Sequence, residues 1–312
     1  MAHVSRLLLV ALLGLVVVPP APADQDAPVF GVGLDLVNVT VTVRDDDGDL
    51  VSDLPVEDFV VTEDGREQTL QLFAPAIDPT DREELTLNLG MLFDTSESMR
   101  ESLKLSKASA VRFLDSIPRA RDLILIFFDR DIQISRYNSE NQQGIFERIL
   151  ATEGQSYTAL YDSIVAYLSR VIDTPGRKVA VIFSDGNDTI SSVSAPQVID
   201  LVRSTNVTIY PVAFSGDRGS GTRAAIRSRA FLGELAKTTG GQVFRPTAYR
   251  EFARIYNQIL DELSGQYVLG YVSDNPAMDG KYRRLEVEVR RPGLRVRHRP
   301  GYNAPEELPP EN

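Results

Sequence analysis

Residues 85–98 read Leu-Thr-Leu-Asn-Leu-Gly-Met-Leu-Phe-Asp-Thr-Ser-Glu-Ser, and this stretch decides the fold. Its first nine residues are mostly apolar, which is typical of a strand buried on both faces, and its last five are polar. Further apolar runs follow at residues 123–128, 179–183 and 207–214. Segments with helical spacing separate these runs. The sequence therefore predicts an α/β fold with a Rossmann-like, doubly wound and mainly parallel sheet.

Helices are expected between and after the apolar runs, because their apolar residues recur at helical spacing. Parallel strands need crossover connections, so these helices should cover both faces of the sheet. The expected helices are residues 101–117, 158–172, 196–204, a segment before Gly240-Gly241, and 249–263, with a further short strand at residues 243–244.

Polar side chains stand where two of the apolar runs end and where one helix begins. Asp94, Ser96 and Ser98 follow the first run, Asp185 follows the third, and Thr158 opens a helix. Ligands of open parallel sheets bind beyond the carboxyl ends of the strands, so these five side chains are expected at one edge. Carboxylates and hydroxyls are hard oxygen donors that suit Mg²⁺, Mn²⁺ or Ca²⁺. The alternative is that the three hydroxyl residues only cap helices and that both aspartates are solvated.

The segment Asp94-Thr95-Ser96-Glu97-Ser98 resembles the D-x-S-x-S signature of the metal-ion-dependent adhesion site (MIDAS) in von Willebrand factor A domains. Thr158 and Asp185 resemble the threonine and the distal aspartate of that site, and the resemblance covers about residues 85–263. It implies that the serine and threonine hydroxyls bind a divalent metal, Mg²⁺ foremost, and that the two aspartates act directly or through water. It also implies that an acidic side chain of a protein partner completes the coordination octahedron.

Strand-like segments flank the α/β region on both sides. Residues 36–43 alternate with a period of two, and strands at 59–62 and 68–73 follow. After the α/β region, a strand is expected at 267–272, and a hairpin of 282–289 with 294–298. We expect both ends to form one β-sandwich-like region around the α/β domain. The expected boundaries are a signal peptide at 1–23, an N-terminal β-region and linker at 24–84, a von Willebrand A domain at 85–263, C-terminal strands at 264–303 and a flexible tail at 304–312.

The first 23 residues have the pattern of a secretory signal peptide. Arg6 precedes an apolar stretch at residues 7–18, two prolines break it, and Ala21-Pro22-Ala23 offers a small-residue cleavage site. The apolar stretch is short for a membrane span, although an uncleaved anchor is the alternative, and no later segment could cross a membrane. The segments 240–244, 267–271 and 299–302 also resemble a bacterial secreted group related to von Willebrand factor A. A secreted or periplasmic location is therefore expected.

Composition excludes several function classes. The chain of 312 residues has a formal charge of −11, which argues against nucleic-acid binding because that needs a basic field. It has no cysteine, so disulfides, thiol catalysis and thiolate metal sites are excluded. Outside the signal segment His298 is the single histidine, and its place in the last strand region, far along the chain from Ser96, argues against a Ser-His-Asp triad.

Three local patterns have a functional and a plain interpretation. Residues 45–49 (Asp-Asp-Asp-Gly-Asp) do not have the order of an EF-hand loop, so a polar turn is favoured. Residues 215–221 form a glycine-rich loop that is either a mobile rim of the metal edge or a plain solvent loop. Late arginines could form an anionic-surface patch, but alternation with glutamates favours cross-strand charge pairs in the expected hairpin. They are Arg283, Arg284, Arg290, Arg291, Arg295, Arg297 and Arg299.

These observations favour an exported protein that is not an enzyme and that binds a protein partner through a metal-held acidic side chain. One alternative is a metal-dependent hydrolase in which Asp94, Asp185 and Asp188 act on a metal-bound water. Another is an envelope scaffold whose metal only stabilises the fold, so that Asp94→Ala would leave partner binding unchanged.

Overall fold

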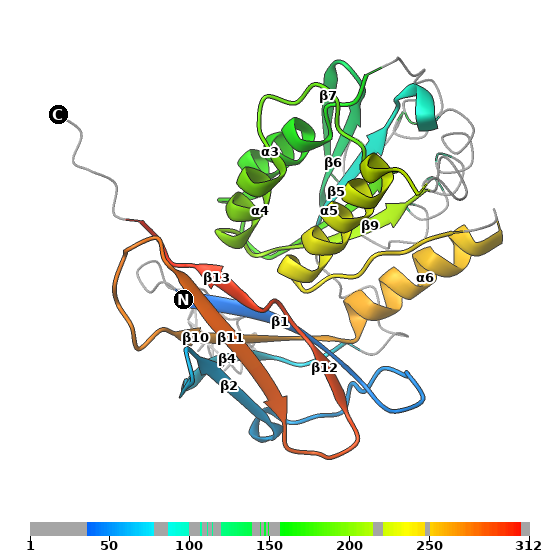
Figure 1. Cartoon of the computed structure of the whole chain (residues 1–312). Helices are drawn as coiled ribbons and strands as arrows, with labels where there is room; N and C mark the ends of the chain where they lie inside the picture. Colours follow the sequence, from blue (N-terminus) through cyan, green and yellow to red (C-terminus); the bar gives the residue numbers. More distant parts are fainter. Residues whose placement is uncertain are drawn as a thin grey trace, which may run out of the picture. The chain divides into compact units, whose positions relative to one another are not determined.

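The computed structural model describes residues 36–77, 87–99, 120–138, 157–214, 221–246 and 250–306, together with residues 107, 111, 114, 144, 147 and 149. Residues Asp35–Asn312 belong to one unit, which contains an α/β region and a β-region (Figure 1). The predicted signal peptide at 1–23, the loop at 215–220 and the last tail residues lie outside the described residues. So does most of the helix predicted over residues 101–117.

A five-stranded sheet forms the centre of the α/β region, in the order β7-β6-β5-β8-β9 (Figure 1). Neighbouring strands from β6 to β9 are parallel, and β7 runs antiparallel to β6 at the edge. All eight residues of β5 are buried, as expected of a central strand covered on both faces. The predicted mainly parallel sheet is confirmed. The strands are β5 (Leu87–Asp94), β6 (Ala120–Phe128), β7 (Ile132–Asn138), β8 (Arg177–Ser184) and β9 (Val207–Ala213).

Helices cover both faces of this sheet. Helices α3, α4 and α5 pack on the face to which Leu92 and Ile182 point. Helix α6 packs on the opposite face, against Phe93 and Phe183, whose ring centroids lie 4.7 Å apart. Successive residues of a strand point to opposite faces, so each central strand contributes to both cores. The helices are α3 (Leu160–Val171), α4 (Ala195–Arg203), α5 (Arg223–Thr239) and α6 (Arg250–Ser264).

Local sequence sets the ends of two of these helices. The backbone N–H of Ser194, before α4, donates to Oε1 of Gln197 at 2.8 Å, which is one half of a capping box. Thr222 caps α5, because its Oγ1 accepts the N–H of Ala225 at 3.2 Å. Helix α5 ends at Gly240, whose φ of 74° lies in the left-handed region that glycine adopts at little cost.

The β-region consists of two four-stranded antiparallel sheets. One has the order β12-β1-β10-β4 and the other β13-β11-β2-β3. Strand β11 alternates between exposed and buried residues along its length, as a strand with one solvated face should. The strands are β1 (Leu36–Arg44), β2 (Phe59–Glu63), β3 (Arg66–Glu67), β4 (Leu70–Ala74), β10 (Gln266–Val272), β11 (Tyr282–Val289), β12 (Arg295–Arg297) and β13 (Gly301–Asn303).

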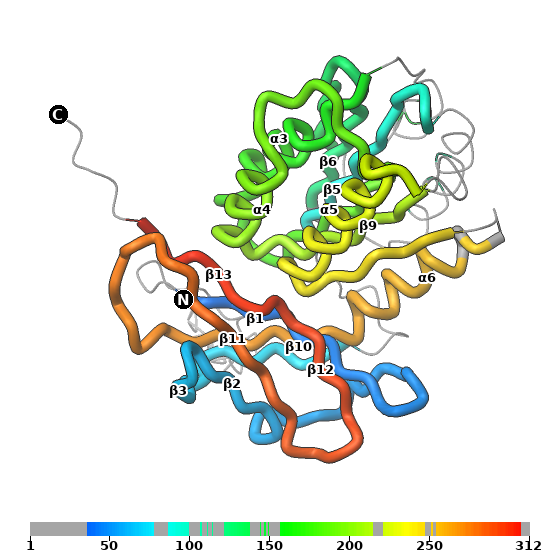
Figure 2. The backbone as a smooth tube through the Cα atoms, viewed as in Figure 1, coloured from blue at the N-terminus to red at the C-terminus, as the bar shows by residue number. Residues whose placement is uncertain are grey.

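Strands from both ends of the chain build this region. Strand β1 pairs with β10, and β2 pairs with β11. Figure 2 accordingly shows blue N-terminal strands beside orange and red C-terminal strands. Val41 and Tyr267 from one sheet share a buried core with Val61 and Val287 from the other. The predicted β-sandwich-like region made from both terminal segments is therefore confirmed.

The predicted hairpin of residues 282–289 with 294–298 is wrong. Strand β11 pairs with β2 and β13, whereas β12 pairs with β1 in the other sheet. The turn at Gly293, with φ of 77°, carries the chain from one sheet to the other. The predicted cross-strand charge pairs are absent from the described residues for this reason. Instead, Arg295 pairs with Asp46 at 3.5 Å, and Arg297 pairs with Glu262.

Two further details differ from the sequence prediction. The edge strand β7 was not predicted, and residues 243–244 form a single parallel bridge from Phe244 to Val212 in place of a strand. The turn predicted at residues 45–49 is present, and in it the Gly48 N–H donates to the carbonyl of Asp45 at 3.1 Å. None of the helices in the described part of the chain combines the length and apolar composition that a membrane span needs.

A buried carboxylate lies where α6 leads into the β-region. Glu262 is fully buried and accepts the hydroxyl of Tyr210 at 2.7 Å. It also pairs with Arg297 of β12 and with Arg44 of β1, the latter at 3.5 Å. A buried charge needs such partners, so this cluster fixes the end of α6 against two strands of the β-region.

Candidate metal centre

Three loops meet at the carboxyl edge of the parallel sheet. Strand β5 ends at Asp94, and β8, its direct neighbour, ends at Ser184. The register pairs Phe93 with Phe183, so Asp94 and Asp185 follow strands that lie side by side. The third loop leads through Thr158 into α3. This is the edge at which open parallel sheets bind their ligands.

Asp94 is a fully buried carboxylate. Its oxygens accept the Ser184 hydroxyl at 2.6 Å and the Ser96 N–H at 3.0 Å. Burial raises the pKa of Asp94 from 3.8 to about 7, while hydrogen bonds from Ser184 and Ser96 oppose the rise and the charge of Asp185 adds to it. The ionised form therefore lacks solvation, and a bound cation would supply the missing counter-charge.

Ser96 and Ser98 present adjacent hydroxyls. Their Oγ atoms lie 3.2 Å apart, with Ser96 buried and Ser98 exposed. Both belong to the tight turn that follows β5, in which the N–H of Met99 donates to the carbonyl of Ser96 at 3.0 Å. This turn places the buried Ser96 hydroxyl beside the Asp94 carboxylate and the exposed Ser98 hydroxyl next to that of Ser96.

Thr158 and Asp185 are joined through the loop that follows β8. The N–H of Thr158 donates to Oγ1 of Thr189 at 2.8 Å, and the carbonyl of Thr158 accepts the Thr189 N–H at 2.9 Å. Oδ1 of Asp185 accepts the N–H of Asn187 at 2.9 Å. Thr158 is buried but is not the helix cap, because the N-cap residue of α3 is Ala159, which has no side-chain cap bond.

The structure thus links the five candidate ligands in different ways. Asp94, Ser96 and Ser98 are joined by direct hydrogen bonds. Asp185 is near enough for its charge to act on Asp94. Thr158 is tied to the site through its backbone, and no hydrogen bond from its hydroxyl to the other four is described among the residues of this edge.

Asp129 is a site residue that the sequence analysis missed. It follows β6, is buried, and accepts the Thr95 hydroxyl at 3.1 Å through Oδ2. Its carbonyl accepts the N–H of Ala159 at 2.9 Å. Asp129 therefore connects the Ser96 loop with the Thr158 loop. The rule that located Asp94, a polar residue directly after a parallel strand, would have found it.

Two further aspartates fix the loop after β8 to the start of α3. Oδ2 of Asp188 accepts the N–H of Tyr161 at 3.0 Å and the hydroxyl of Ser191 at 2.6 Å. Asp162, in the first turn of α3, accepts the N–H of Ser192 at 2.9 Å. Carboxylates are favourable at a helix N-terminus. These bonds connect the loop after β8 with the start of α3, and so connect the Asp185 loop with the Thr158 loop.

The donor set fits a hard divalent cation. No three His, Cys, Asp or Glu side chains gather as a metal-binding group within the described ranges, so a metal here depends on hydroxyl oxygens as well as carboxylates. Mg²⁺ and Mn²⁺ accept such ligands and keep several waters, whereas zinc sites usually use nitrogen or sulfur. Two carboxylates with three hydroxyls leave room for a further oxygen ligand.

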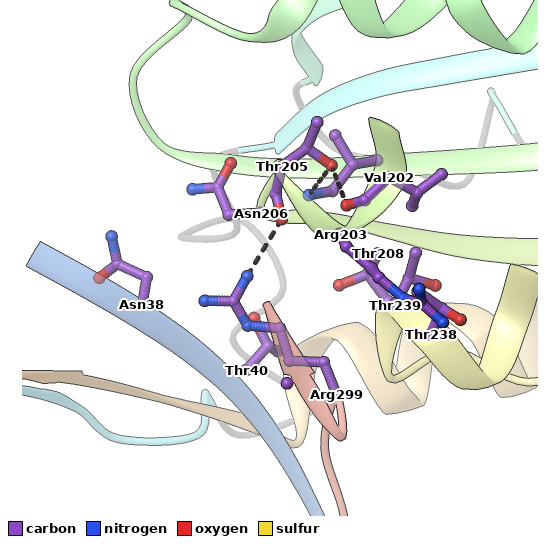
Figure 3. Close-up of a pocket in the computed structure, with 12 residues that line it drawn as sticks. Asn38, Thr40, Val202, Arg203, Thr205, Asn206, Thr208, Thr238, Thr239 and Arg299 are labelled. Carbon is purple, nitrogen blue, oxygen red and sulfur yellow. Dashed lines mark hydrogen bonds between the residues drawn. The ribbon is translucent and has the colours of Figure 1, made fainter. Parts of the chain in front are cut away.

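A small pocket elsewhere in the unit does not belong to this edge. It has a water-accessible volume of about 10 Å³, the size that holds a single water molecule. Figure 3 shows Arg299 reaching across it to the carbonyl of Thr205, at 3.0 Å. None of the five candidate ligands lines it.

The comparisons with known proteins concern the α/β region. The model of the von Willebrand factor type A domain family matches residues 88–258. No curated protein matches the chain. Solved structures similar to it share little sequence identity with it.

One of them is a von Willebrand factor type A protein from Catenulispora acidiphila, with 11 % identity and a TM-score of 0.48 over 89 % of this chain and 76 % of that one. Another is an aerotolerance-related membrane protein from Bacteroides fragilis, with 16 % identity and a TM-score of 0.44 over 56 % of this chain and 98 % of that one. A third is proximal thread matrix protein 1 of the mussel byssus, whose MIDAS motif is occupied by zinc. It has 16 % identity and a TM-score of 0.45 over 59 % of this chain and 46 % of that one.

Proposed function

The chain belongs to the von Willebrand factor type A domain family, and on this premise we propose that it is an exported protein that binds a protein partner through a divalent cation. Asp94, Ser96, Ser98, Thr158 and Asp185 would hold the cation, with Mg²⁺ as the expected ion and Mn²⁺ or Ca²⁺ as alternatives. The cation would supply an open coordination position for an acidic side chain of the partner.

The observation that carries this proposal is the buried carboxylate of Asp94. It lies at the sheet edge beside the Asp185 charge, and its donors among the described residues are a hydroxyl and a backbone amide, which carry no compensating charge. Two neighbouring negative charges are unfavourable when one of them is buried. A cation between them would remove this penalty, and the hydroxyls of Ser96 and Ser98 would add neutral ligands.

The hydrogen bonds between the surrounding loops support a role in binding. Asp129, Thr189 and Asp188 hold the three loops by hydrogen bonds that do not involve the metal-facing oxygens of Asp94. A site that is ordered before its ligand arrives loses less entropy on binding. The chain's own residues would therefore position the cation, and the partner would contribute one carboxylate.

The hydrolase alternative has weaker support. Oδ2 of Asp188 already accepts the N–H of Tyr161 and the hydroxyl of Ser191, and its Oδ1 accepts the Ser191 N–H at 3.2 Å. His298 lies in the β-region, where its Nε2 accepts the Val287 N–H at 3.2 Å. Neither side chain is placed to act as a general base at the sheet edge.

The proposed location is secreted or periplasmic, as the signal-like residues 1–23 indicate. The resemblance to the bacterial secreted group remains a prediction of the same kind. N-terminal sequencing of the protein recovered from an exporting host checks the proposed cleavage of the signal peptide. A mature protein that begins at Asp24 is expected, and a chain that keeps Met1 in the membrane fraction would support the anchor alternative.

Binding of a single carboxylate tests the proposed function. The probe is the peptide acetyl-Gly-Gly-Glu-Gly-Gly-amide, with the glutamine peptide as its control, and saturation-transfer NMR detects weak binding to the chain beginning at Asp24. We expect the glutamate peptide to bind with Mg²⁺ and not with EDTA. Asp185→Ala should lose this binding, and Asp173→Ala, which removes an exposed charge after α3, should keep it.

Three other results would contradict the proposal. Equal binding of the glutamate and glutamine peptides would show that no carboxylate is recognised. Stabilisation by Mg²⁺ without peptide binding would favour the scaffold alternative. Turnover of a phosphate or carboxylate ester that Asp185→Ala abolishes would favour the hydrolase.

A further inference from the structure

An exposed arginine and an exposed tyrosine lie together at the rim of the candidate metal centre. Arg130 comes directly after Asp129, and Tyr157 comes directly before Thr158. The Arg130 guanidinium carbon lies 5.1 Å from the centroid of the Tyr157 ring, within the range of a cation–π contact. Tyr157 is 44 % exposed, so its ring lies at the surface.

The backbone on either side of this pair is fixed to the metal edge. Asp129 holds the Thr95 hydroxyl with its carboxylate and the Ala159 N–H with its carbonyl. Consecutive Cα atoms are about 3.8 Å apart, so Arg130 begins one residue from the point where these loops meet. The pair therefore spans the loop after β6 and the loop that carries Thr158.

The charge of Arg130 is available for a ligand. Its contact with Tyr157 is with the ring, and among the described residues it forms no ion pair. The N–H of the adjacent Asp131 donates to Oδ1 of Asp129 at 3.0 Å, which fixes the turn that carries Arg130. A guanidinium stacked on an aromatic ring keeps the N–H donors at its perimeter, which match a carboxylate in a fork.

We propose that Arg130, held against Tyr157, is a second carboxylate-binding position, so that the partner presents an acidic segment with two carboxylates. This inference rests on the proposed function, because one carboxylate enters the metal's open position and Arg130 takes the other. The chain carries a formal charge of −11 and would otherwise repel an acidic segment. A cation beside the exposed Arg130 makes this edge the place where such a segment is attracted.

The test compares the glutamate peptide above with acetyl-Gly-Glu-Gly-Glu-Gly-amide on the Mg²⁺-loaded chain that begins at Asp24. Two equivalent carboxylates give about a twofold preference from statistics alone. An additional exposed ion pair with Arg130 should raise the preference to about fivefold or more. Affinities come from NMR titration, because millimolar binding is sufficient for that measurement.

Three variants assign the preference to its residue. Arg130→Gln should reduce it to the statistical value while leaving the affinity for the single-glutamate peptide unchanged. Arg130→Lys keeps the charge without the planar fork and should give an intermediate preference. Arg170→Gln is the matched control, because it removes an exposed arginine at the far end of α3 and should leave the preference at the wild-type value.

The outcomes separate this inference from the proposed function. Mg²⁺-dependent binding of both peptides with the same preference in wild type and Arg130→Gln would overturn the second position and leave the proposed function standing. Absence of Mg²⁺-dependent binding of either peptide to wild type would overturn both. An equal loss of preference in Arg170→Gln would show a general charge effect and would also overturn the assignment to Arg130.

Discussion

Replacing Asp94 with asparagine should separate the cost of its buried charge from the contribution of a metal. Burial is the main reason that the pKa of Asp94 rises from 3.8 to about 7. The folded protein therefore holds a proton on this carboxyl more tightly than the unfolded chain does. In the metal-free protein the resulting stabilisation is complete below about pH 4 and is lost as the pH rises through about 7.

The magnitude follows from the same pKa values. A rise from 3.8 to about 7 corresponds to about 4 kcal/mol of unfolding free energy lost by pH 8. Asp94→Asn avoids this loss, but it weakens the charge-assisted hydrogen bond from Ser184, which costs about 1–2 kcal/mol. Metal-free Asp94→Asn should therefore be about 2 kcal/mol more stable than wild type at pH 8, and no more stable than wild type at pH 4.

Urea unfolding followed by circular dichroism measures this difference, in EDTA and in millimolar Mg²⁺. Mg²⁺ should stabilise the wild-type protein at pH 8 and should leave Asp94→Asn unchanged. Asp173→Asn, an exposed aspartate after α3, serves as the control. The reasoning would be refuted if Asp94→Asn were the less stable protein at pH 8 in EDTA, or if Mg²⁺ stabilised both proteins equally.

Three further changes test other parts of the structure. Asp129→Asn weakens the acceptor of the Thr95 hydroxyl, so Mg²⁺ affinity measured by calorimetry should fall about tenfold; an unchanged affinity would mean that Asp129 does not position the site. Gly90→Ala would place a Cβ 2.2 Å from Cε2 of the buried Tyr167, so the urea midpoint should fall by the equivalent of about 2–3 kcal/mol. No loss would show that β5 and α3 can separate. Glu262→Gln removes the buried carboxylate that pairs with the half-buried Arg297 and should cost about 3 kcal/mol in the same assay; full stability would show that solvent reaches this cluster.

The α/β fold was predictable because its strands are continuous apolar runs. Strand β5 is buried throughout and β8 is buried except at Arg177, and the intervening sequence has helical spacing. The edge strand β7 was missed because its apolar residues, Ile132 and Ile134, alternate with polar ones over a short length. An edge strand is exposed along one side and needs no continuous apolar run.

Pairing between strands was less predictable than their existence. Alternation along β11 identifies the face that is buried, and it does not identify the neighbour. The sequence between β11 and β12 reads as a hairpin turn, yet β12 pairs with β1, which lies more than 200 residues away in the chain. Long-range partners of this kind depend on the packing of the whole sandwich.

The candidate site was largely accessible from sequence, because a rule about strand ends places Asp94 and Asp185 at one edge. The same rule applied to β6 would have included Asp129. The supporting bonds from Thr189 to Thr158 and from Asp188 to Tyr161 could not be predicted, since they depend on how the loop after β8 folds over the start of α3.

Calorimetric titration of Mg²⁺ into the EDTA-treated chain beginning at Asp24 tests the cation site most directly. Wild type is compared with Ser96→Ala/Asp185→Ala, and with Ser169→Ala/Asp173→Ala as a control of the same composition at the far end of α3. We expect saturable binding of one ion to the wild type and the control, and none to the site variant. Absence of saturable binding to the wild type, or unchanged binding to the site variant, would contradict the account.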